Sequence, residues 1–431
     1  TSLKFLFNIL DKFSRFYLDI ERELKAKSKT NISLKVFSLY LSGFLYTLIR
    51  LKHSSWISVK AWILAQRKRK LYSEIINSQN TYKNIKFNEY YVFHTALSSK
   101  TSTKSLQLQT LAYIDVFDAI FTKEQPDYLI SIGDSRLCIE IAIALAKSKK
   151  IKVYYIEQGP FNTTFFDDEG VNANISIRSK SNLVNHTITN VTTKSESNTK
   201  KYKRSPIYRG LDIVLMSLFE NTFVYPPDLK YSDLNSYRSK RSYSKLEHIK
   251  KEQRALLILQ VPLDVNMIYH SPNYKSHTEI IESIYTNLPE SLKLVVREHP
   301  LYVNKYEAPL YEFINKNNIL IDNSTPLNSA LESSKIIIVN NSTVGIEAIL
   351  NYNTVVVLGN AFYDNQDICL KLKNKKELPT LLEKALDNIP NKTKIDTFEN
   401  ELYNSVLLKG SITDKTLQSS KTIANHLLAN E

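Results

Sequence analysis

The chain has 431 residues, enough for two ordinary domains, and its 43% hydrophobic and 23% charged residues exclude a disordered or fibrous protein. Its 57 lysines and arginines outnumber 43 aspartates and glutamates. The net charge of +14 favours an anionic partner: nucleic acid, anionic lipid, or a phosphorylated or carboxylated substrate. No run of roughly 18 apolar residues occurs, and no lysine-rich start precedes a cleavable apolar core. We therefore expect neither a transmembrane helix nor a signal peptide.

The N-terminal region, residues 1–85, is predicted to be helical, aromatic and basic. Apolar side chains recur at helical spacing in its first part: Phe5, Leu6, Ile9, Leu10, Phe13, Phe16 and Tyr17. A second apolar stretch, residues 36–70, ends in the basic run Arg67-Lys-Arg-Lys70. Two interpretations are open. One is a helical layer packed on the domain; the other is a peripheral membrane contact in which aromatic side chains insert and lysines face anionic lipid.

Strands and helices are expected to alternate between residues 86 and 172. The apolar runs predict strands at 90–94, 128–132 and 152–156. Helices are predicted at 106–121 and from the turn Gly133-Asp134-Ser135-Arg136 to residue 146. This alternation favours a doubly wound parallel sheet.

Residues 173–250 are interpreted as an insertion or connector, because polar and charged residues dominate them, with one helix at 211–223. A second α/β unit is predicted over 251–431. Its expected strands are 255–260, 292–297, 319–321, 336–339 and 354–359. Its expected helices are 278–287, 306–317, 326–333, one that starts at Ser342, 376–389 and 414–429. The predicted organisation is therefore an N-terminal domain, 1–250, and a C-terminal domain, 251–431.

The two cysteines, Cys138 and Cys369, each lie in an apolar stretch. A buried free thiol is the expected state of both, rather than a disulfide or a metal ligand. This favours a reducing compartment, the cytoplasm.

Two acidic motifs lie at the end of the first predicted unit. Glu157 ends the strand at 152–156, where open α/β sheets place functional groups, and its carboxylate could act as a general acid or base. The alternative is a loop carboxylate that caps the next element. Ten residues after Glu157 comes the motif Asp167-Asp-Glu-Gly170-Val-Asn172.

The first strand of the second unit leads into Gln260-Val-Pro-Leu-Asp264. Asp264 could be a nucleophile or a base at a crevice between domains. The alternative is an aspartate that follows a proline in a turn and has no chemical role.

The next strand ends in Arg297-Glu-His-Pro300. Arginine and histidine at a strand end can bind phosphate or carboxylate, and arginine can do so through two parallel hydrogen bonds. The proline biases His299 toward an extended conformation and holds it in the turn.

A third strand end, residues 336–339, leads through Asn340-Asn341-Ser342-Thr343 into a helix. The Ser342 and Thr343 hydroxyls and the helix N-terminal amides could hold a phosphate. Glu347, one turn into the helix, could accept hydrogen bonds from ribose hydroxyls. The alternative is a capped helix that only packs on the sheet.

Several motifs are absent from the sequence. There is no Walker or Rossmann glycine fingerprint, which disfavours ATP hydrolysis and NAD binding. There is no zinc-type spacing of cysteine and histidine and no Gly-x-Ser-x-Gly motif.

Together the motifs resemble the capsular polysaccharide synthesis family that contains the bacterial β-Kdo (3-deoxy-manno-octulosonate) transferases. The resemblance covers about residues 125–172 and 254–365. It rests on Glu157-x-Gly159, Asp167-x-x-Gly170-Val-Asn172, Gln260-x-x-x-Asp264, Arg297-Glu-His-Pro300, Asn341-Ser-Thr-Val-Gly-Ile-Glu-Ala348 and Val355-Val-Val-Leu-Gly-Asn-Ala-Phe-Tyr363. It implies a GT-B-like α/β fold with two Rossmann-type parallel-sheet domains and an added N-terminal helical region.

The resemblance also implies a retaining enzyme that uses CMP-Kdo and needs no metal or other cofactor. Asp264 takes the role of nucleophile, with Asp167 as the alternative, and Glu157 the role of acid/base. Leu263 stands where a family member has glycine. The implied ligands of the substrates are Gln260, Arg297, His299, Asn341, Ser342, Thr343, Glu347, Asp167 and Asn172.

The implied partners are a CMP-sugar donor, a glycan or glycolipid acceptor and an anionic membrane surface, at the cytoplasmic side of the inner membrane. Three other functions stay open. One is an inverting sialyltransferase that uses CMP-sialic acid, and another is a non-catalytic, membrane-associated component of polysaccharide assembly. The third is nucleic-acid binding, which is disfavoured because no recognition motif accompanies the charge.

Overall fold

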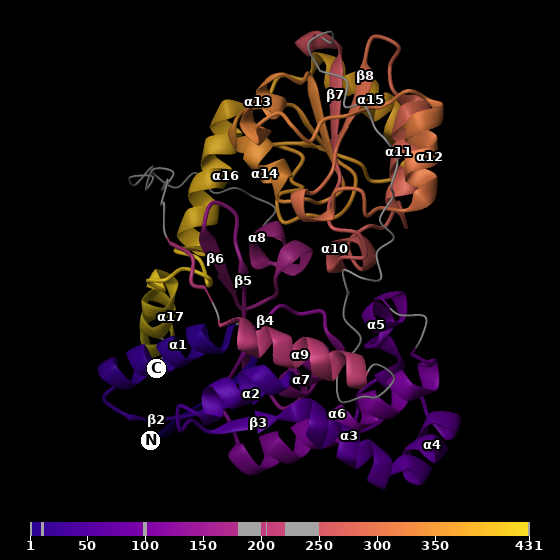
Figure 1. Cartoon of the computed structure of the whole chain (residues 1–431). Helices are drawn as coiled ribbons and strands as arrows, with labels where there is room; N and C mark the ends of the chain where they lie inside the picture. Colours follow the sequence, from indigo (N-terminus) through magenta and orange to yellow (C-terminus); the bar gives the residue numbers. More distant parts are fainter. Residues whose placement is uncertain are drawn as a thin grey trace. The chain divides into compact units, whose positions relative to one another are not determined.

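The computed structural model describes residues 2–9, 13–97, 101–179, 200–203, 205–219 and 250–429. The chain divides into two compact units (Figure 1). Unit 1 comprises residues 1–171, 192–228 and 406–431, and unit 2 comprises residues 172–191 and 229–405.

Unit 1 is built on a seven-stranded sheet in the order β13-β6-β5-β4-β1-β2-β3. Its strands are β1 (Ser2–Ile9), β2 (Asn31–Ser38), β3 (Ser54–Trp56), β4 (Tyr128–Ile132), β5 (Lys152–Gln158), β6 (Thr163–Asp167) and β13 (Leu407–Lys409). Strands β1 to β5 are parallel, whereas β6 and β13 run antiparallel to their neighbours. The doubly wound sheet predicted for this part of the chain is confirmed.

Helices cover both faces of this sheet, which explains why every residue of β4 is buried. Leu129 of β4 packs in one cluster with α3 (Ile57–Arg67), α6 (Thr103–Glu124) and α7 (Leu137–Ser148). Ile130 and Ile132 of β4 pack on the other face with α1 (Ser14–Lys27) and α17 (Gln418–Ala429). The remaining helices of unit 1 are α2 (Leu41–Leu48), α4 (Arg69–Ser78), α5 (Val92–Leu97) and α9 (Pro206–Leu218).

The prediction of a wholly helical region at 1–85 is wrong. Strands β1, β2 and β3 lie within it and complete the first sheet, with β2 paired to β1 along eight residues. The strand expected at 90–94 is also wrong, because α5 occupies that place. The five-residue run at 90–94 fits a buried strand and a buried helix equally well, so its tertiary partners decide. In β2, by contrast, Ile32, Leu34 and Val36 alternate with polar residues, which is the period of a strand and was overlooked. Phe37 and Tyr40 are buried in the core, as a packed layer requires.

The domain boundary also differs from the prediction at 250/251. Residues 406–431 return to unit 1, where β13 pairs with β6 and α17 packs on α1. Residues 172–191 already belong to unit 2, although they precede the predicted boundary. The helix expected at 211–223 is α9, which starts earlier; residues 220–223 lie outside the described part of the chain.

Unit 2 contains a six-stranded parallel sheet in the order β12-β11-β10-β7-β8-β9. Its strands are β7 (Arg254–Ile258), β8 (Lys293–Arg297), β9 (Leu320–Ile321), β10 (Ile336–Val339), β11 (Val355–Val357) and β12 (Leu370–Lys371). Its helices are α8 (Ser176–Ser179), α10 (Val265–Ile268), α11 (His277–Asn287), α12 (Ala308–Lys316), α13 (Leu327–Glu332), α14 (Val344–Leu350), α15 (Leu378–Asp387) and α16 (Lys392–Ser405). The predicted pair of Rossmann-type sheets is thus confirmed, while β12 and α16 were missed.

The order of these strands reverses between β7 and β10, since the chain adds β8 and β9 on one side of β7 and β10 to β12 on the other. Open α/β sheets bind ligands outside the carboxyl ends of the strands at such a switch point. The switch point therefore marks where in unit 2 a ligand is expected.

Both cysteines are free and buried, as expected from their apolar surroundings. Within the described residues, no helix is long and apolar enough to cross a membrane.

A buried aspartate joins three segments of unit 1. Asp115 of α6 is 6% exposed, and its carboxylate accepts four hydrogen bonds. Oδ2 accepts from Lys68 Nζ at 2.7 Å and from the Tyr72 hydroxyl at 2.8 Å. Oδ1 accepts from the Tyr82 hydroxyl at 2.9 Å and lies 2.7 Å from Lys83 Nζ. These contacts tie α4 and the loop after it to α6.

Candidate functional site

Two buried amide side chains meet at the switch point of unit 2. Gln260 follows β7 and Asn341 follows β10, and each is 6% exposed. The Asn341 backbone N–H donates to Gln260 Oε1 at 3.3 Å. The structure thus brings together two residues that the sequence places 81 positions apart.

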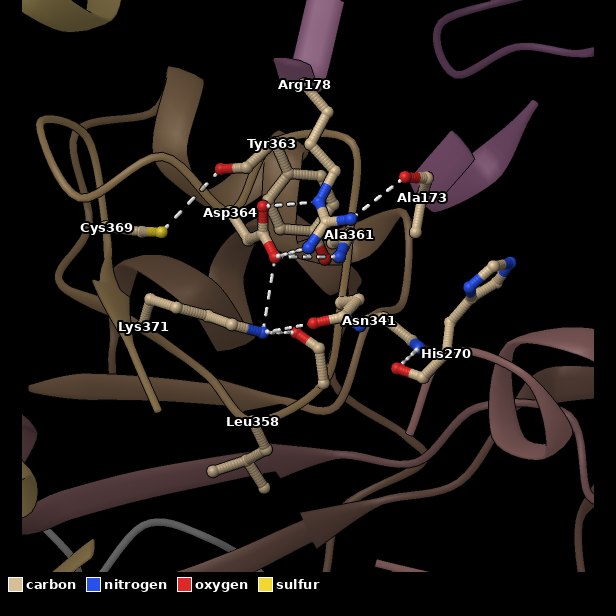
Figure 2. A network of polar contacts seen from close by, with 12 residues as sticks. Ala173, Arg178, His270, Asn341, Leu358, Ala361, Tyr363, Asp364, Cys369 and Lys371 are labelled. Carbon is tan, nitrogen blue, oxygen red and sulfur yellow. Dashed lines mark hydrogen bonds and ion pairs between the residues drawn. The ribbon is translucent and has the colours of Figure 1, made fainter. Parts of the chain in front are cut away.

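The pair leaves one donor and one acceptor open. Asn341 Nδ2 donates to the carbonyls of Asn266 at 2.9 Å and His270 at 3.0 Å, which fixes the orientation of the amide. Figure 2 shows Asn341 directed toward His270. Asn341 Oδ1 and Gln260 Nε2 are buried without a partner among the described residues. Because unpaired buried polar atoms are costly, this arrangement favours a bound polar group or water.

Tyr306 connects this pair to the Arg297-Glu-His-Pro300 loop. Its hydroxyl donates to the Gln260 carbonyl and accepts from the His299 backbone N–H, both at 3.0 Å. Burial raises the pKa of Tyr306, so the hydroxyl stays protonated at neutral pH and can keep donating. The ends of β7 and β8 are therefore held by one side chain, which sequence reasoning did not single out.

His299 is partly buried and its ring is oriented by the turn that follows. Nδ1 accepts a hydrogen bond from Leu301 N–H at 3.3 Å, so the proton of the neutral ring is assigned to Nε2. Burial lowers the pKa of His299, which keeps the ring neutral at pH 7. His299 can therefore offer an Nε2–H donor to a ligand.

Glu298 anchors the same loop from inside. It is 3% exposed, and Oε1 accepts from the Tyr311 hydroxyl and from Asn304 N–H. Oε2 accepts from Asn323 Nδ2 at 2.6 Å. With both oxygens bonded to protein, Glu298 has a structural role.

One terminal nitrogen of Arg297 already donates hydrogen bonds within the protein. This nitrogen donates to the carbonyls of Asp322 at 3.2 Å and Thr325 at 2.7 Å, in the loop after β9. A role as ligand of phosphate or carboxylate therefore rests on its other nitrogens.

Asp264 is the N-cap of the short helix α10. Its Oδ1 accepts from Val265 N–H at 2.8 Å and its Oδ2 from Asn266 Nδ2 at 3.2 Å. Asn266 in turn accepts from Asn341 through its backbone carbonyl. Asp264 thus has the structural role in a turn that the sequence left open as an alternative. Hydrogen bonds through Asn266 also connect it to the pair formed by Gln260 and Asn341.

Leu263, just before Asp264, has a left-handed backbone with φ of +55°. We expect Leu263→Gly to stabilise the protein by about 0.5–1 kcal/mol, because glycine adopts this conformation without the steric cost that other residues bear. The side chain is 42% exposed, so little packing is lost. Urea unfolding measures the difference. Leu263→Ala is the control, since it keeps the strained conformation; an equal gain in both variants would contradict this account.

The turn before α14 only partly matches the expected anion site. Thr343 is exposed and its side chain caps nothing, whereas the Ser342 hydroxyl accepts from Val344 N–H at 3.3 Å. The Ser342 carbonyl accepts from Gly345 N–H at 2.9 Å and from the Tyr363 hydroxyl. A Cβ on Gly345 would lie 2.2 Å from that hydroxyl, which explains the glycine.

Glu347 is half-buried on the first turn of α14. Burial raises the pKa of its carboxyl group. A desolvated carboxylate gains most from hydrogen-bond donors, so a ribose or sugar hydroxyl would suit it.

The candidate residues of unit 1 lie at the ends of β5 and β6. Glu157 Oε1 accepts from Gln158 N–H at 2.9 Å, and Glu157 Oε2 lies beside Gly133, whose φ is +69°. Asp167 is 6% exposed and its Oδ1 accepts from the N–H groups of Glu169 and Gly170 at 2.8 and 2.9 Å. Asp167 therefore closes its own turn, which argues for a structural role.

Asn172 belongs to unit 2, with φ of +53°, and starts the segment that ends in α8.

An ion-pair cluster that the sequence did not reveal fixes this segment (Figure 2). Arg178 donates from Nε and a terminal nitrogen to the two carboxylate oxygens of Asp364 at 2.9 and 3.1 Å. Lys371 Nζ lies 3.2 Å from the same carboxylate and donates to the Gly359 carbonyl. All three Lys371 protons have protein acceptors once Asn360 Oδ1 at 3.3 Å is included, so the cluster is structural.

A hollow of about 610 Å³ lies at the other edge of the unit 2 sheet, before the starts of β8 and β9. It is lined by residues 285, 288–290, 292–294 and 317–320, none of them a predicted site residue. Ligand sites of such sheets lie at the carboxyl edge, so the switch point remains the candidate site.

The fold and site define a class: a two-unit α/β protein of Rossmann type with a polar site at a topological switch point. Residues 127–395, more than half of the chain, match the model of the family described as "Capsule polysaccharide biosynthesis protein", and the chain belongs to this family. The family inferred from the motifs is thereby confirmed.

Two relatives show partial similarity. The protein FixF of Sinorhizobium fredii is 29% identical over 164 residues, which are 36% of this chain and 38% of FixF. The capsule polysaccharide export protein KpsS of Escherichia coli is 24% identical over 267 residues, or 55% of this chain and 68% of KpsS. The chain therefore matches about two fifths of FixF and two thirds of KpsS.

Solved structures give distant similarity. The KpsC β-Kdo 2,7-transferase of Thermosulfurimonas dismutans matches with 14% identity and a TM-score of 0.34, over 66% of this chain and 89% of that one. The UDP-GlcNAc 2-epimerase of Methanocaldococcus jannaschii matches with 13% identity and a TM-score of 0.36 over the full length of both chains. Both scores are below 0.5, so the fold assignment rests on the two sheets themselves.

Proposed function

We propose that this chain is a glycosyltransferase that moves Kdo from CMP-β-Kdo to a glycan acceptor with retention of configuration. The observation that carries the proposal is the switch-point pair. Gln260 and Asn341 offer an open donor and acceptor there, and Tyr306 joins them to His299. Gln260, His299 and Asn341 each belong to one of the six motifs that resemble the β-Kdo transferases.

In the proposed reaction Asp264 attacks the anomeric carbon of Kdo as CMP leaves with the bonding electron pair, which gives a glycosyl-enzyme ester. Glu157 then takes the proton of the acceptor hydroxyl, whose oxygen displaces Asp264 at the same carbon. Two inversions give retention, as in retaining glycosidases. Asp264 stays hydrogen-bonded to Val265 and Asn266, which orients the carboxylate for attack.

The other side chains are proposed to hold the donor. Neutral His299, through Nε2–H, and Arg297 would bind the phosphate or the Kdo carboxylate. The Ser342 turn and Glu347 would bind CMP, and Asn172 would contact substrate. The proposed steps use no metal ion.

A screen of CMP-sugars tests the donor. We expect CMP-Kdo to raise the melting temperature and to release CMP, and intact-mass spectrometry to show an increase of one Kdo. Asp264→Asn is expected to lack the adduct while still binding the donor. Exclusive use of CMP-sialic acid with an α-linked product would instead establish the inverting sialyltransferase alternative.

A second candidate is a non-catalytic component of polysaccharide assembly, favoured by the similarity to a protein named for capsule export. It predicts binding of a glycan or glycolipid without CMP release from any CMP-sugar. Equal CMP release in the wild type, Asp264→Asn and a buffer blank would support it over the transferase.

We also propose that the chain works at the cytoplasmic side of the inner membrane, where an anionic surface would match its net charge of +14.

A further inference from the structure

Helices α2 and α9 of unit 1 lie side by side and antiparallel (Figure 1). Asp212 of α9 accepts from the backbone N–H and hydroxyl of Ser42, at the start of α2. Tyr208, one turn earlier in α9, packs edge-on against Tyr46, one turn later in α2, with ring centres 5.8 Å apart. The last turn of α2 and the first turn of α9 therefore meet at one end of the pair.

Large apolar side chains project into solvent at this end. Leu51 is 94% exposed, Ile207 80%, Ile49 66% and Leu48 47%. We refer to these four residues as the apolar tip. Leu51 also has a left-handed φ of +54°, a costly conformation for leucine. Neighbouring exposed aliphatic residues of this size are unusual unless they contact a partner.

The charge around the apolar tip is positive. Lys200, Lys201 and Lys203 are exposed just before α9, and Arg50 is exposed within the tip. Their segment is held in place, because the Lys200 carbonyl and Tyr202 N–H pair with residues 415 and 413. Among the described residues, the acids that contact this region are buried: Asp212 is 1% exposed, Glu21 3% and Asp414 1%.

We propose that the apolar tip and Lys200, Lys201 and Lys203 form a docking surface for an anionic lipid bilayer. The tip residues are neighbouring, strongly exposed aliphatic side chains, which suits insertion among lipid headgroups. The lysines would be attracted to the negative surface potential over a Debye length. This deepens, and rests on, the proposed membrane location, but it does not depend on the donor site.

Co-sedimentation with vesicles, without any sugar nucleotide, tests the proposal. We expect the wild type to bind vesicles of phosphatidylglycerol and phosphatidylcholine, less at high salt, and not to bind pure phosphatidylcholine. The apolar variant is Leu51→Asn with Ile207→Ser; asparagine tolerates the left-handed conformation, so the fold is not strained. Its matched control is Ile389→Ser, which replaces an isoleucine that is 88% exposed in unit 2.

The charge variant combines Lys200→Glu, Lys201→Glu and Lys203→Glu. Its control reverses three exposed lysines of unit 2: Lys293, Lys373 and Lys376. We expect the apolar variant to bind vesicles at least about 10-fold more weakly, and the charge variant about 100-fold, at about 1 kcal/mol per lysine. Both controls should bind like the wild type.

Wild-type binding by both surface variants would overturn the proposal. So would a tip-dependent dimer in light scattering, because the partner would then be a second copy of the chain. CMP release measured without vesicles tests the proposed transferase function independently of lipid binding. In that assay the surface variants should match the wild type whether or not they bind lipid.

Discussion

Replacing His299 with alanine is expected to lower CMP release from CMP-Kdo by at least about 100-fold, the range in which a positioned donor or acid–base group contributes. His299 is held by Tyr306 and by the turn at Leu301, and its lowered pKa keeps Nε2–H available to the leaving phosphate at neutral pH. Steady-state release of CMP at saturating donor measures the effect.

His299→Asn is the matched control, since asparagine can replace the acceptor that caps the turn but has no equivalent of Nε2–H. We expect the asparagine variant to be nearly as stable as the wild type and as slow as the alanine variant. Turnover close to wild type in both would remove His299 from the proposed site.

The pH dependence of the wild type has a defined direction. A pKa below the usual 6.5 means that His299 is neutral at pH 7 and gains a proton only below its normal range. If the neutral ring is the active form, release of CMP should stay constant as pH falls from 7 through 6.5 and decline only at lower pH. A decline centred at 6.5 or above, and absent in His299→Asn, would contradict the role of burial.

Asp115→Asn is expected to destabilise the protein by about 2–3 kcal/mol, because the carboxylate is buried and accepts charged hydrogen bonds, whereas its lysine partners are 38–41% exposed and keep part of their hydration. The substitution leaves Lys68 and Lys83 without their shared carboxylate, and it replaces the acceptor oxygen of either Tyr72 or Tyr82 by an NH2 donor. Thermal and urea unfolding measure the loss. Asp118→Asn is the control: Asp118 also contacts Lys83, but its side chain is 25% exposed, so the cost should be about 1 kcal/mol or less.

Because of the Asp115 carboxylate, we expect the stability of the folded protein to fall at acid pH. Its hydrogen bonds with Lys68, Lys83, Tyr72 and Tyr82 lower the pKa of Asp115 to about 2, against burial, from a value near 3.9 in the unfolded chain. Between these two pKa values the folded state binds fewer protons than the unfolded state. The stabilisation that the Asp115 carboxylate provides is therefore complete above pH about 4. Roughly 2 kcal/mol of stability should be lost as pH falls from 4 through 2. An Asp115→Asn variant should lack this component; an unchanged acid profile would refute it.

Much of unit 2 could be predicted from the sequence because its parallel strands are short, continuously apolar and separated by helices. The runs at 336–339 and 292–297 were found nearly to the residue, as β10 and β8. Strand ends with polar motifs then placed Gln260, Arg297, His299 and Ser342 at one edge of a sheet, because parallel strands share a carboxyl edge.

The start and the end of the chain were misassigned for different reasons. In β1 the residues Leu3, Phe5, Phe7 and Ile9 alternate with mostly polar neighbours, and in β2 Ile32, Leu34 and Val36 do the same, which is the period of a strand that the helical prediction overlooked. Pairing with each other and with β4 places both strands in the sheet. The return of residues 406–431 to unit 1 is a long-range contact, set by packing of Ile423 and Leu427 on α1, which local pattern does not encode.

At the candidate site the sequence determined which residue types are present, and their order and spacing identified the family. Tertiary structure decided how they are used. It pairs Gln260 with Asn341, since the strand order reverses between β7 and β10. It also assigns Glu298 to the interior and connects His299 to Gln260 through Tyr306. Hydrogen bonds between residues tens of positions apart form only once the sheet brings strand ends together, so no local pattern reveals them.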